Sequence, residues 1–260
     1  MQPARLFATY IGGPTALLEY GGLRLVTDPT FDAAGTEYTT PVYTLRKLAG
    51  PALAESRLGA LDAVLLSHDH HFDNLDHAGR AVLARAPIVL TTRAGAERLG
   101  GNARGLEPWE TVELVARTGE RVRVTATPAR HGPVDGDRGP VIGFVLARPD
   151  DPRRGVYLSG DTVWYEGVAE VARRFHVTTA FLFLGAARVN AAGPAHLTFT
   201  AEEAVEAVRA FDDALVAPLH YEGWEHFTEG RTVIASAFDA AGVSKRVRWL
   251  EAGVRTELGG

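Results

Sequence analysis

The chain carries one stretch that decides both its fold and its chemistry: Ser67-His68-Asp69-His70-His71-Phe72-Asp73-Asn74-Leu75-Asp76. It directly follows Ala63-Val64-Leu65-Leu66, a short apolar run typical of a strand buried on both faces. Layered α/β proteins place ligand sites at the ends of such strands. Imidazole and carboxylate groups suit Zn, Fe or Mn, so this crowding of His and Asp indicates a metal site rather than a solvated polar loop.

Strand-like runs lie on both sides of this stretch. Before it, Gly21-Gly22 joins two such runs and predicts a hairpin. We expect strands over Arg5–Tyr10, Thr15–Tyr20, Leu23–Thr27, Ala63–Leu66, Ile88–Leu90, Thr111–Leu114, Arg121–Thr127, Val141–Leu146, Val156–Leu158, Ala180–Leu184, Leu215–Val216 and Arg246–Leu250.

Helical patterns alternate with these strands, and each has one apolar face. We expect helices over Leu75–Ala86, around the stripe Val168–Phe175, after the capping-box pair Thr200 and Glu203, and over Arg231–Gly242. Arg148–Arg154 is expected to form a surface turn. The pattern predicts an α/β layered fold in which two sheets pack together with helices outside, as one domain over residues 1–260.

Composition limits the possible partners. The 260 residues carry a net charge of −5 without a basic stripe, which argues against nucleic acid. There is no cysteine, so thiolate zinc sites and Cys nucleophiles are excluded. Met1–Arg5 lacks a signal-peptide pattern, and no apolar run approaches the ~18 residues of a membrane span. We therefore expect a cytoplasmic protein that acts on a small molecule, without a membrane or nucleic-acid partner and with its oligomeric state open.

The decisive stretch resembles the His-x-His-x-Asp-His signature of the metallo-β-lactamase superfamily, and the resemblance covers nearly the whole chain. Tyr10–Thr15 and Thr27–Pro29 resemble the opening hairpin of the branch that includes ascorbate-phosphate lactonase-like enzymes. His131, Asp161 and His220 resemble, in order and spacing, the next metal histidine, the bridging aspartate and the last histidine. The resemblance implies an αββα sandwich of two mixed sheets, with a metal-dependent hydrolase site at one edge of the sheets.

The signature departs from the family in its register. Matched from His68, it puts Phe72 and Asp73 where Asp and His belong; matched from Asp73, it puts Asp69 at the first His. A one-residue insertion reconciles the two matches and makes His68 and His71 the histidine pair. We favour it, because the residues from Phe72 to Asp76 resemble the family's Tyr-Asp-His-Leu-Asp continuation. The implied metal ligands are then His68, His71, Asp73, His131, Asp161 and His220.

Asn74 stands where this alignment expects the last histidine of the signature. An amide oxygen is a much poorer zinc ligand than imidazole. The second metal position would keep Asp73, Asp161 and His220. We therefore expect one or two divalent ions, zinc first with Mn or Fe as alternatives, and a second ion that binds more weakly or is absent.

Several further residues are candidates for outer contacts to the metal or for substrate binding: Asp28, Asp69, His70, Asn74, His196 and Trp224. Asp28 either hydrogen-bonds a metal histidine or shapes a turn. His196 either orients substrate or supports a loop. Trp224, with His226 and Phe227, either lines the pocket or packs in an aromatic cluster.

The expected reaction is hydrolysis by metal-activated water of an ester, lactone, amide or phosphodiester bond. Asp73 is the catalytic candidate, because it would orient the water or accept its proton. Two alternatives stay open: a metal-poor binding protein that kept the fold, and a single-iron redox enzyme. The content and identity of bound metal separate these three possibilities.

Overall fold

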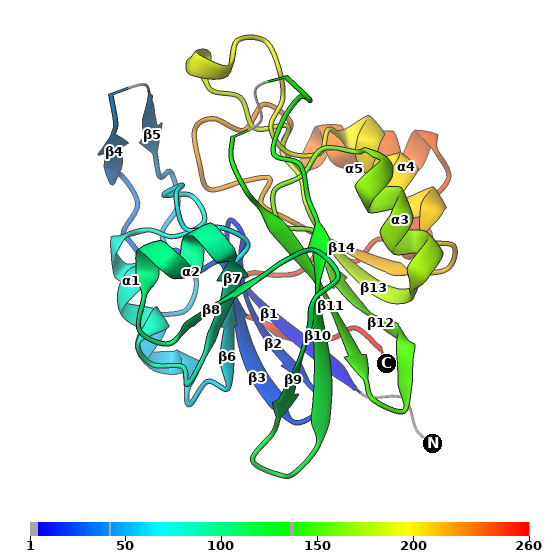
Figure 1. The fold of residues 1–260 in the computed structure, drawn as a ribbon. Helices are drawn as coiled ribbons and strands as arrows, with labels where there is room; N and C mark the ends of the chain where they lie inside the picture. The colour runs from blue at the N-terminus through cyan, green and yellow to red at the C-terminus, as the bar shows by residue number, and fades with distance from the viewer. Residues whose placement is uncertain (1–4, 42, 136–137, 260) are drawn as a thin grey trace.

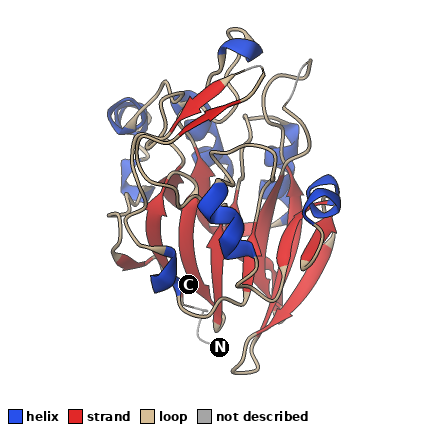
Figure 2. Cartoon of the chain, turned by 90° about the vertical axis from the view of Figure 1, so that its left-hand side faces the viewer, coloured by secondary structure: helices blue, strands red, loops and turns tan. Residues whose placement is uncertain are grey.

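Two mixed β-sheets stack face to face, with helices on the outer face of each (Figures 1 and 2). The computed structural model describes residues 5–41, 43–135 and 138–259. The first sheet contains β1 (Leu6–Gly12), β2 (Thr15–Tyr20), β3 (Leu23–Thr27), β6 (Ala63–Leu65), β7 (Val89–Thr92), β8 (Ala103–Leu106) and β15 (Arg255–Glu257). Their order across the sheet is β15-β1-β2-β3-β6-β7-β8, and the four strands from β3 to β8 run parallel.

The second sheet contains β9 (Thr111–Val115), β10 (Arg121–Pro128), β11 (Ile142–Arg148), β12 (Asp151–Leu158), β13 (His176–Phe183) and β14 (Leu215–Leu219). The order is β14-β13-β12-β11-β10-β9, parallel from β12 to β14 and antiparallel elsewhere. A separate hairpin, β4 (Glu37–Thr39) with β5 (Thr44–Arg46), projects beyond the sheets (Figure 1).

Helices α1 (His77–Leu83) and α2 (Arg93–Leu99) lie beside the first sheet, whereas α3 (Glu166–Arg174), α4 (Ala201–Ala210) and α5 (Arg231–Ala240) cover the second (Figure 1). Short 3-10 turns occur at Glu55–Leu58, Asn190–Ala192 and Ser244–Arg246. Among the described residues, no helix has the length and apolar character needed to cross a bilayer.

Strand β6 shows how the sequence specifies the layers. Ala63 and Leu65 join the apolar cluster between the two sheets, whereas Val64 and Leu66 join the cluster beneath α1. Successive side chains of a strand point to opposite faces, so a fully apolar run fits only a strand covered on both sides. The predicted double burial of this strand is confirmed, and the decisive stretch begins where the strand ends.

The direction of the strands brings the other candidate residues to the same region. Strands β10, β12 and β14 run in one direction across the second sheet. Each is followed within three residues by a candidate ligand: His131 after β10, Asp161 after β12 and His220 after β14. Carboxyl ends of strands that share a direction meet at one edge of a sheet, which is where layered folds form their sites.

The predicted αββα arrangement is confirmed, and so is the Gly-Gly hairpin. Gly21 and Gly22 have φ of 53° and 75°, values that favour glycine and suit a tight turn between twisted strands. The expected turn at Arg148–Arg154 is tighter than predicted, because β12 begins at Asp151. Residues 1–4, which bear on the signal-peptide prediction, lie outside the described part of the chain.

Two element predictions need correction. The strand expected at Arg246–Leu250 does not form, and Val247 makes only a single bridge to Val216. The alternating apolar residues Val247 and Trp249 pack against the apolar cluster between the second sheet and its helices. The last strand is β15 instead. Helix α1 begins at His77 rather than Leu75, because the Asp76 carboxylate accepts from Gly79 N–H as the N-cap.

Candidate metal centre

Three histidines gather around one point beside the end of β6. The Nε2 atom of His68 lies 2.9 Å from His71 Nδ1, which in turn lies 3.1 Å from His131 Nε2. The Asp161 Oδ2 atom lies 3.5 Å from His131 Nε2 and 4.0 Å from His68 Nε2. Ligands that share one ion at about 2.1 Å are separated from each other by about 3.0–3.4 Å, so this first cluster has the spacing of a metal site.

These imidazoles are held in the form that binds metal. Burial, together with the neighbouring His131, lowers the pKa of His71 to about 3. Burial and the nearby His71 ring hold the pKa of His68 well below its ordinary value. Both rings are therefore neutral at pH 7 and offer a lone pair, which metal binding requires.

A second cluster joins Asp73, Asp161 and His220. The Nε2 atom of His220 lies 3.4 Å from Asp161 Oδ1 and 3.5 Å from Asp73 Oδ2. Asp161 thus faces the first cluster with one oxygen and the second cluster with the other. Burial would lower the pKa of His220, but the Asp161 and Asp73 carboxylates outweigh it and raise the pKa to about 10. Burial raises the pKa of Asp73, yet His226 and His220 hold it well below its usual range.

Buried donor atoms of both clusters fit cations. Asn74 Oδ1 and His220 Nε2 beside the second cluster, and the Asp161 Oδ2 atom that faces the first cluster, are buried without a hydrogen-bond partner among the described residues. Unpaired buried polar atoms are costly, so a cluster of them points to a bound group that satisfies them. Imidazole and carboxylate donors suit Zn, Fe or Mn. The residues present therefore fit one ion beside His68, His71 and His131 and a second beside His220.

Supporting contacts fix two of these rings. His131 Nδ1 donates to the Leu197 carbonyl at 2.8 Å, which leaves its Nε2 lone pair directed at the first cluster. His68 Nδ1 pairs with Ser67 Oγ at 2.9 Å, and Asp28 Oδ1 accepts from both Ser67 N–H and Ser67 Oγ. Asp28 therefore reaches a candidate ligand through Ser67, rather than by the direct contact considered from the sequence.

Other candidates lie away from the clusters. Asp69 forms an ion pair with Arg98, and His196 Nε2 lies 3.1 Å from Glu203 Oε1. Trp224 packs against the Tyr38 ring beneath the β4–β5 hairpin. None of these contacts involves a candidate ligand.

His70 needs a closer comparison with His71. Its Nε2 donates to the Arg138 carbonyl at 2.6 Å. A His70 nitrogen still lies within 4.8 Å of nitrogens of His68 and His71, so His70 is the rival of His71 in the first cluster. His71 differs in that its Nδ1 atom lies within 3.1 Å of nitrogens of both His68 and His131.

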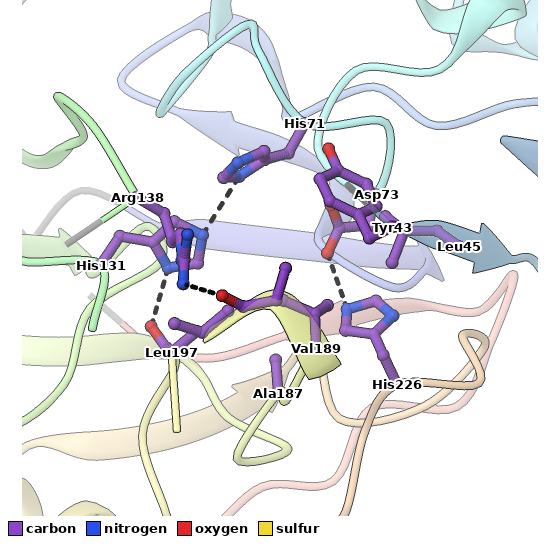
Figure 3. A pocket seen from close by; sticks show the side chains of 11 residues that line it. Tyr43, Leu45, His71, Asp73, His131, Arg138, Ala187, Val189, Leu197 and His226 are labelled. Carbon is purple, nitrogen blue, oxygen red and sulfur yellow. Dashed lines mark hydrogen bonds and ion pairs between the residues drawn. The ribbon is translucent and has the colours of Figure 1, made fainter. Parts of the chain in front are cut away.

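A cavity of about 320 Å³ opens over both clusters (Figure 3). Figure 3 places His71 and His131 on one side of it and Asp73 with His226 on the other. Its remaining lining is mostly apolar with one cation and one phenol: Tyr43, Leu45, Arg138, Ala187, Val189, Ala191 and Leu197. Sequence patterns pointed to none of these seven residues, because they come from the β4–β5 hairpin and two long loops whose paths depend on tertiary contacts.

His226 is the contact that the sequence analysis underrated. Its Nε2 lies 2.9 Å from Asp73 Oδ2, whereas His220 Nε2 lies 3.5 Å from the same oxygen. The only sequence signal was its place in the aromatic cluster after His220, which indicated pocket lining or packing alone.

Comparison with known proteins identifies the family. The sequence matches the beta-lactamase superfamily domain over residues 23–221, which is more than half of the chain. The chain belongs to the metallo-β-lactamase superfamily. The resemblance carried by the His/Asp stretch is thus confirmed at the level of the superfamily.

Full-length relatives of this superfamily member have modest identity. The UPF0173 protein YddR of Bacillus subtilis (strain 168) is 24% identical over 251 residues, which cover 92% of this chain and 94% of that protein. A UPF0173 metal-dependent hydrolase of Pelotomaculum thermopropionicum is 27% identical over 270 residues, covering 96% and 99%.

Solved structures share the fold across the whole chain. The isothiocyanate hydrolase from Delia radicum gut bacteria has a TM-score of 0.80 at 20% identity, covering 98% of this chain and 100% of that one. Igni18, a metallo hydrolase from the archaeon Ignicoccus hospitalis, has a TM-score of 0.72 at 19% identity, covering 98% and 99%. At these identities the likeness establishes the arrangement of sheets and helices.

Proposed function

We propose that this chain hydrolyses an ester, lactone, amide or phosphodiester bond of a small molecule at the two-cluster centre. By class it is a metal-dependent hydrolase of the metallo-β-lactamase superfamily, because the family match spans residues 23–221 and a relative that is matched over 99% of its length bears that description. The observation that carries the proposal is Asp161, whose two oxygens face the two clusters, while His71, Asp73 and His131 of those clusters line the cavity. Hydrolysis needs donors that hold a cation next to a space for substrate, and this arrangement supplies both.

The proposed ligands of the first ion are His68, His71 and His131, and Asp161 is shared with a second position that includes Asp73 and His220. Zinc is the metal that this imidazole-rich set favours, with Mn or Fe as the alternatives. A divalent ion bound there would lower the pKa of water and polarise a substrate oxygen.

Asp73 is the proposed acceptor of the proton from water. It lines the cavity, and its pKa is held well below the usual range, so it is ionised at neutral pH. Its Oδ2 atom is already close to His226 Nε2, which fixes the direction of the carboxylate. An ionised, oriented carboxylate that lines the cavity could reach a water bound there, as a general base must.

The walls of the cavity suggest the kind of substrate. Leu45, Val189 and Leu197 form an apolar surface beside the clusters, while Arg138 offers a cation. A cavity of about 320 Å³ has the size of a site for a compact small molecule. We therefore propose a small substrate with an apolar body, and the Arg138 side chain favours an acidic or strongly polar group on it.

Metal analysis followed by a substrate panel tests this function. The purified chain should contain zinc, manganese or iron, or take it up after stripping, and it should then hydrolyse at least one member of a panel of lactones, esters, amides, phosphodiesters and an isothiocyanate. Asp73→Asn should lower kcat by about 100-fold or more even where the first ion is retained, whereas His176→Ala, on the exposed start of β13, serves as the unchanged control. A chain that takes up no metal would instead be a binding protein on this fold. Oxygen consumption without hydrolysis would point to iron redox chemistry.

A further inference from the structure

The second metal position lacks one imidazole relative to its superfamily signature. Asn74 is fully buried, and its Nδ2 atom lies 3.3 Å from Asp161 Oδ1. Its own oxygen has no hydrogen-bond partner among the described residues. Because an amide oxygen is a weak donor to zinc, Asp73, Asp161 and His220 alone leave the position short of a fourth strong ligand.

His226 approaches the same position from a different part of the chain. It lies on the loop between β14 and α5, far from the His/Asp stretch in sequence. Its Nε2 lies 2.9 Å from Asp73 Oδ2, and His220 Nε2 lies 3.5 Å from that same oxygen. The His226 side chain is only 9% exposed, although it lines the cavity. Two imidazoles thus converge on one carboxylate oxygen.

The loop that carries His226 is fixed by backbone contacts. The Arg188 N–H donates to the His226 carbonyl at 3.0 Å, and two residues later Thr228 N–H donates to the Gly185 carbonyl at 2.9 Å. The imidazole also packs against the Phe227 ring, with 4.6 Å between the ring centroids. The side chain is therefore held in place before any ligand binds, as a ligand of useful affinity must be.

We propose that His226 supplies the imidazole that Asn74 cannot, so that the second metal position consists of Asp73, Asp161, His220 and His226. The inference rests on the proposed function, because it presupposes that these clusters bind metal. The separations of 2.9, 3.5 and 3.4 Å along His226–Asp73–His220–Asp161 match the spacing of donors around one ion, about 3.0–3.4 Å. The first cluster has the same spacing, at 2.9 and 3.1 Å.

The competing explanation is that His226 acts only as a hydrogen-bond donor to Asp73. A glutamine at position 226 distinguishes the two roles, because it can replace a hydrogen-bond donor but not a nitrogen ligand. A Gln side chain keeps an N–H that reaches toward Asp73 but offers no nitrogen lone pair to a metal. His226→Gln should therefore preserve a hydrogen-bonding role and abolish a ligand role, while His226→Ala abolishes both.

The test measures bound metal rather than activity. The wild type, His226→Ala, His226→Gln and the control His176→Ala are stripped, titrated with zinc or cobalt(II), and analysed for ions per chain. We expect the wild type and the control to bind two ions. Both His226 variants should keep the first ion and bind the second at least about 100-fold more weakly. Loss of an outer hydrogen bond alone typically lowers metal affinity by about 10- to 100-fold.

A fourth variant, His226→Cys, gives a spectroscopic signature. The chain has no cysteine, so a sulfur-to-cobalt charge-transfer band in His226→Cys can arise only from position 226. Two cobalt ions together with that band support the proposal, and so does loss of the second ion from this variant. Two ions without the band overturn it.

The remaining outcomes separate this inference from the function beneath it. A wild type that binds no metal refutes the proposed function itself. A wild type that binds only one ion, or a His226→Ala variant that binds two with unchanged affinity, overturns the role of His226 and leaves the hydrolase proposal standing. If His226→Gln keeps the second ion and His226→Ala loses it, His226 is a hydrogen-bond donor and not a ligand. Circular dichroism of each variant confirms that folding is intact.

Discussion

Replacing His71 and His70 in turn by alanine tests the register of the decisive stretch. The insertion alignment predicts that His71 is a ligand of the first ion and that His70 is not. In the structure, His71 Nδ1 lies within 3.1 Å of nitrogens of both His68 and His131, whereas His70 Nε2 is bonded to the Arg138 carbonyl. His71→Ala should therefore weaken the first ion far more than His70→Ala does.

The size of the difference follows from the number of ligands. Zinc held by four protein ligands has an apparent binding free energy of about 10–16 kcal/mol, or roughly 3 kcal/mol for each ligand. Loss of His71 should thus weaken zinc binding by roughly 100-fold or more. His70 hydrogen-bonds a backbone carbonyl and not a ligand, so its loss should cost less than about 10-fold, the lower end for an outer-shell partner.

Competition with a zinc-binding dye of known affinity measures both variants on one scale. Far-UV circular dichroism and urea unfolding serve as controls, since His70→Ala removes one hydrogen bond worth about 1 kcal/mol of stability. Equal losses of zinc affinity would refute the insertion. A larger loss for His70→Ala would establish the opposite register, with His68 and His70 as the pair.

Two further predictions follow from charges near the site. Because zinc binds neutral imidazole and the pKa of His220 is about 10, affinity at the second position should rise by up to about tenfold per pH unit between about pH 6 and 9. The zinc affinity of the first position should depend little on pH through His71, because a pKa of about 3 keeps that ring neutral over this range. Zinc-buffered titrations in which the affinity of both positions rises equally with pH would contradict this difference. Lys47→Met should lower the free energy of unfolding by about 3 kcal/mol, because it strips Asp76 of its buried partner at 2.8 Å. Lys245→Met, at an exposed position, should change the free energy of unfolding by no more than about 0.5 kcal/mol, as measured by urea unfolding. Equal effects of the two variants would show that the buried pair contributes nothing to stability.

The sheets and most of the helices could be predicted because their signals are local. The Gly21-Gly22 turn and the apolar run at β6 each determine a few neighbouring residues. Strand β15 could not be found this way, because its three residues are a strand only by pairing with β1 at the other end of the chain. Helix α2 also went unpredicted, although Thr92 caps it by accepting from Gly95 N–H.

The residues of the candidate site likewise differ in how far local sequence patterns could predict them. His131, Asp161 and His220 could be proposed because their order and spacing resemble the superfamily signature, and each lies within three residues of the end of a strand. His226 could not, since no strand or helix carries it. Its position depends on hydrogen bonds between its loop and the distant residues Arg188 and Gly185. Local sequence patterns do not contain such contacts.

The insertion alignment predicts a structural consequence beyond the register. Both residues between His68 and His71 contact other parts of the chain: Asp69 pairs with Arg98, and His70 donates to the Arg138 carbonyl. His71 meanwhile presents its Nδ1 atom to His68 and His131. The His70 contact also ties the ligand loop to Arg138, the cation in the cavity wall. On the insertion alignment and the proposed function, the His70 contact would couple the metal cluster to the proposed substrate surface, so we predict that His70→Ala alters substrate KM more than metal content.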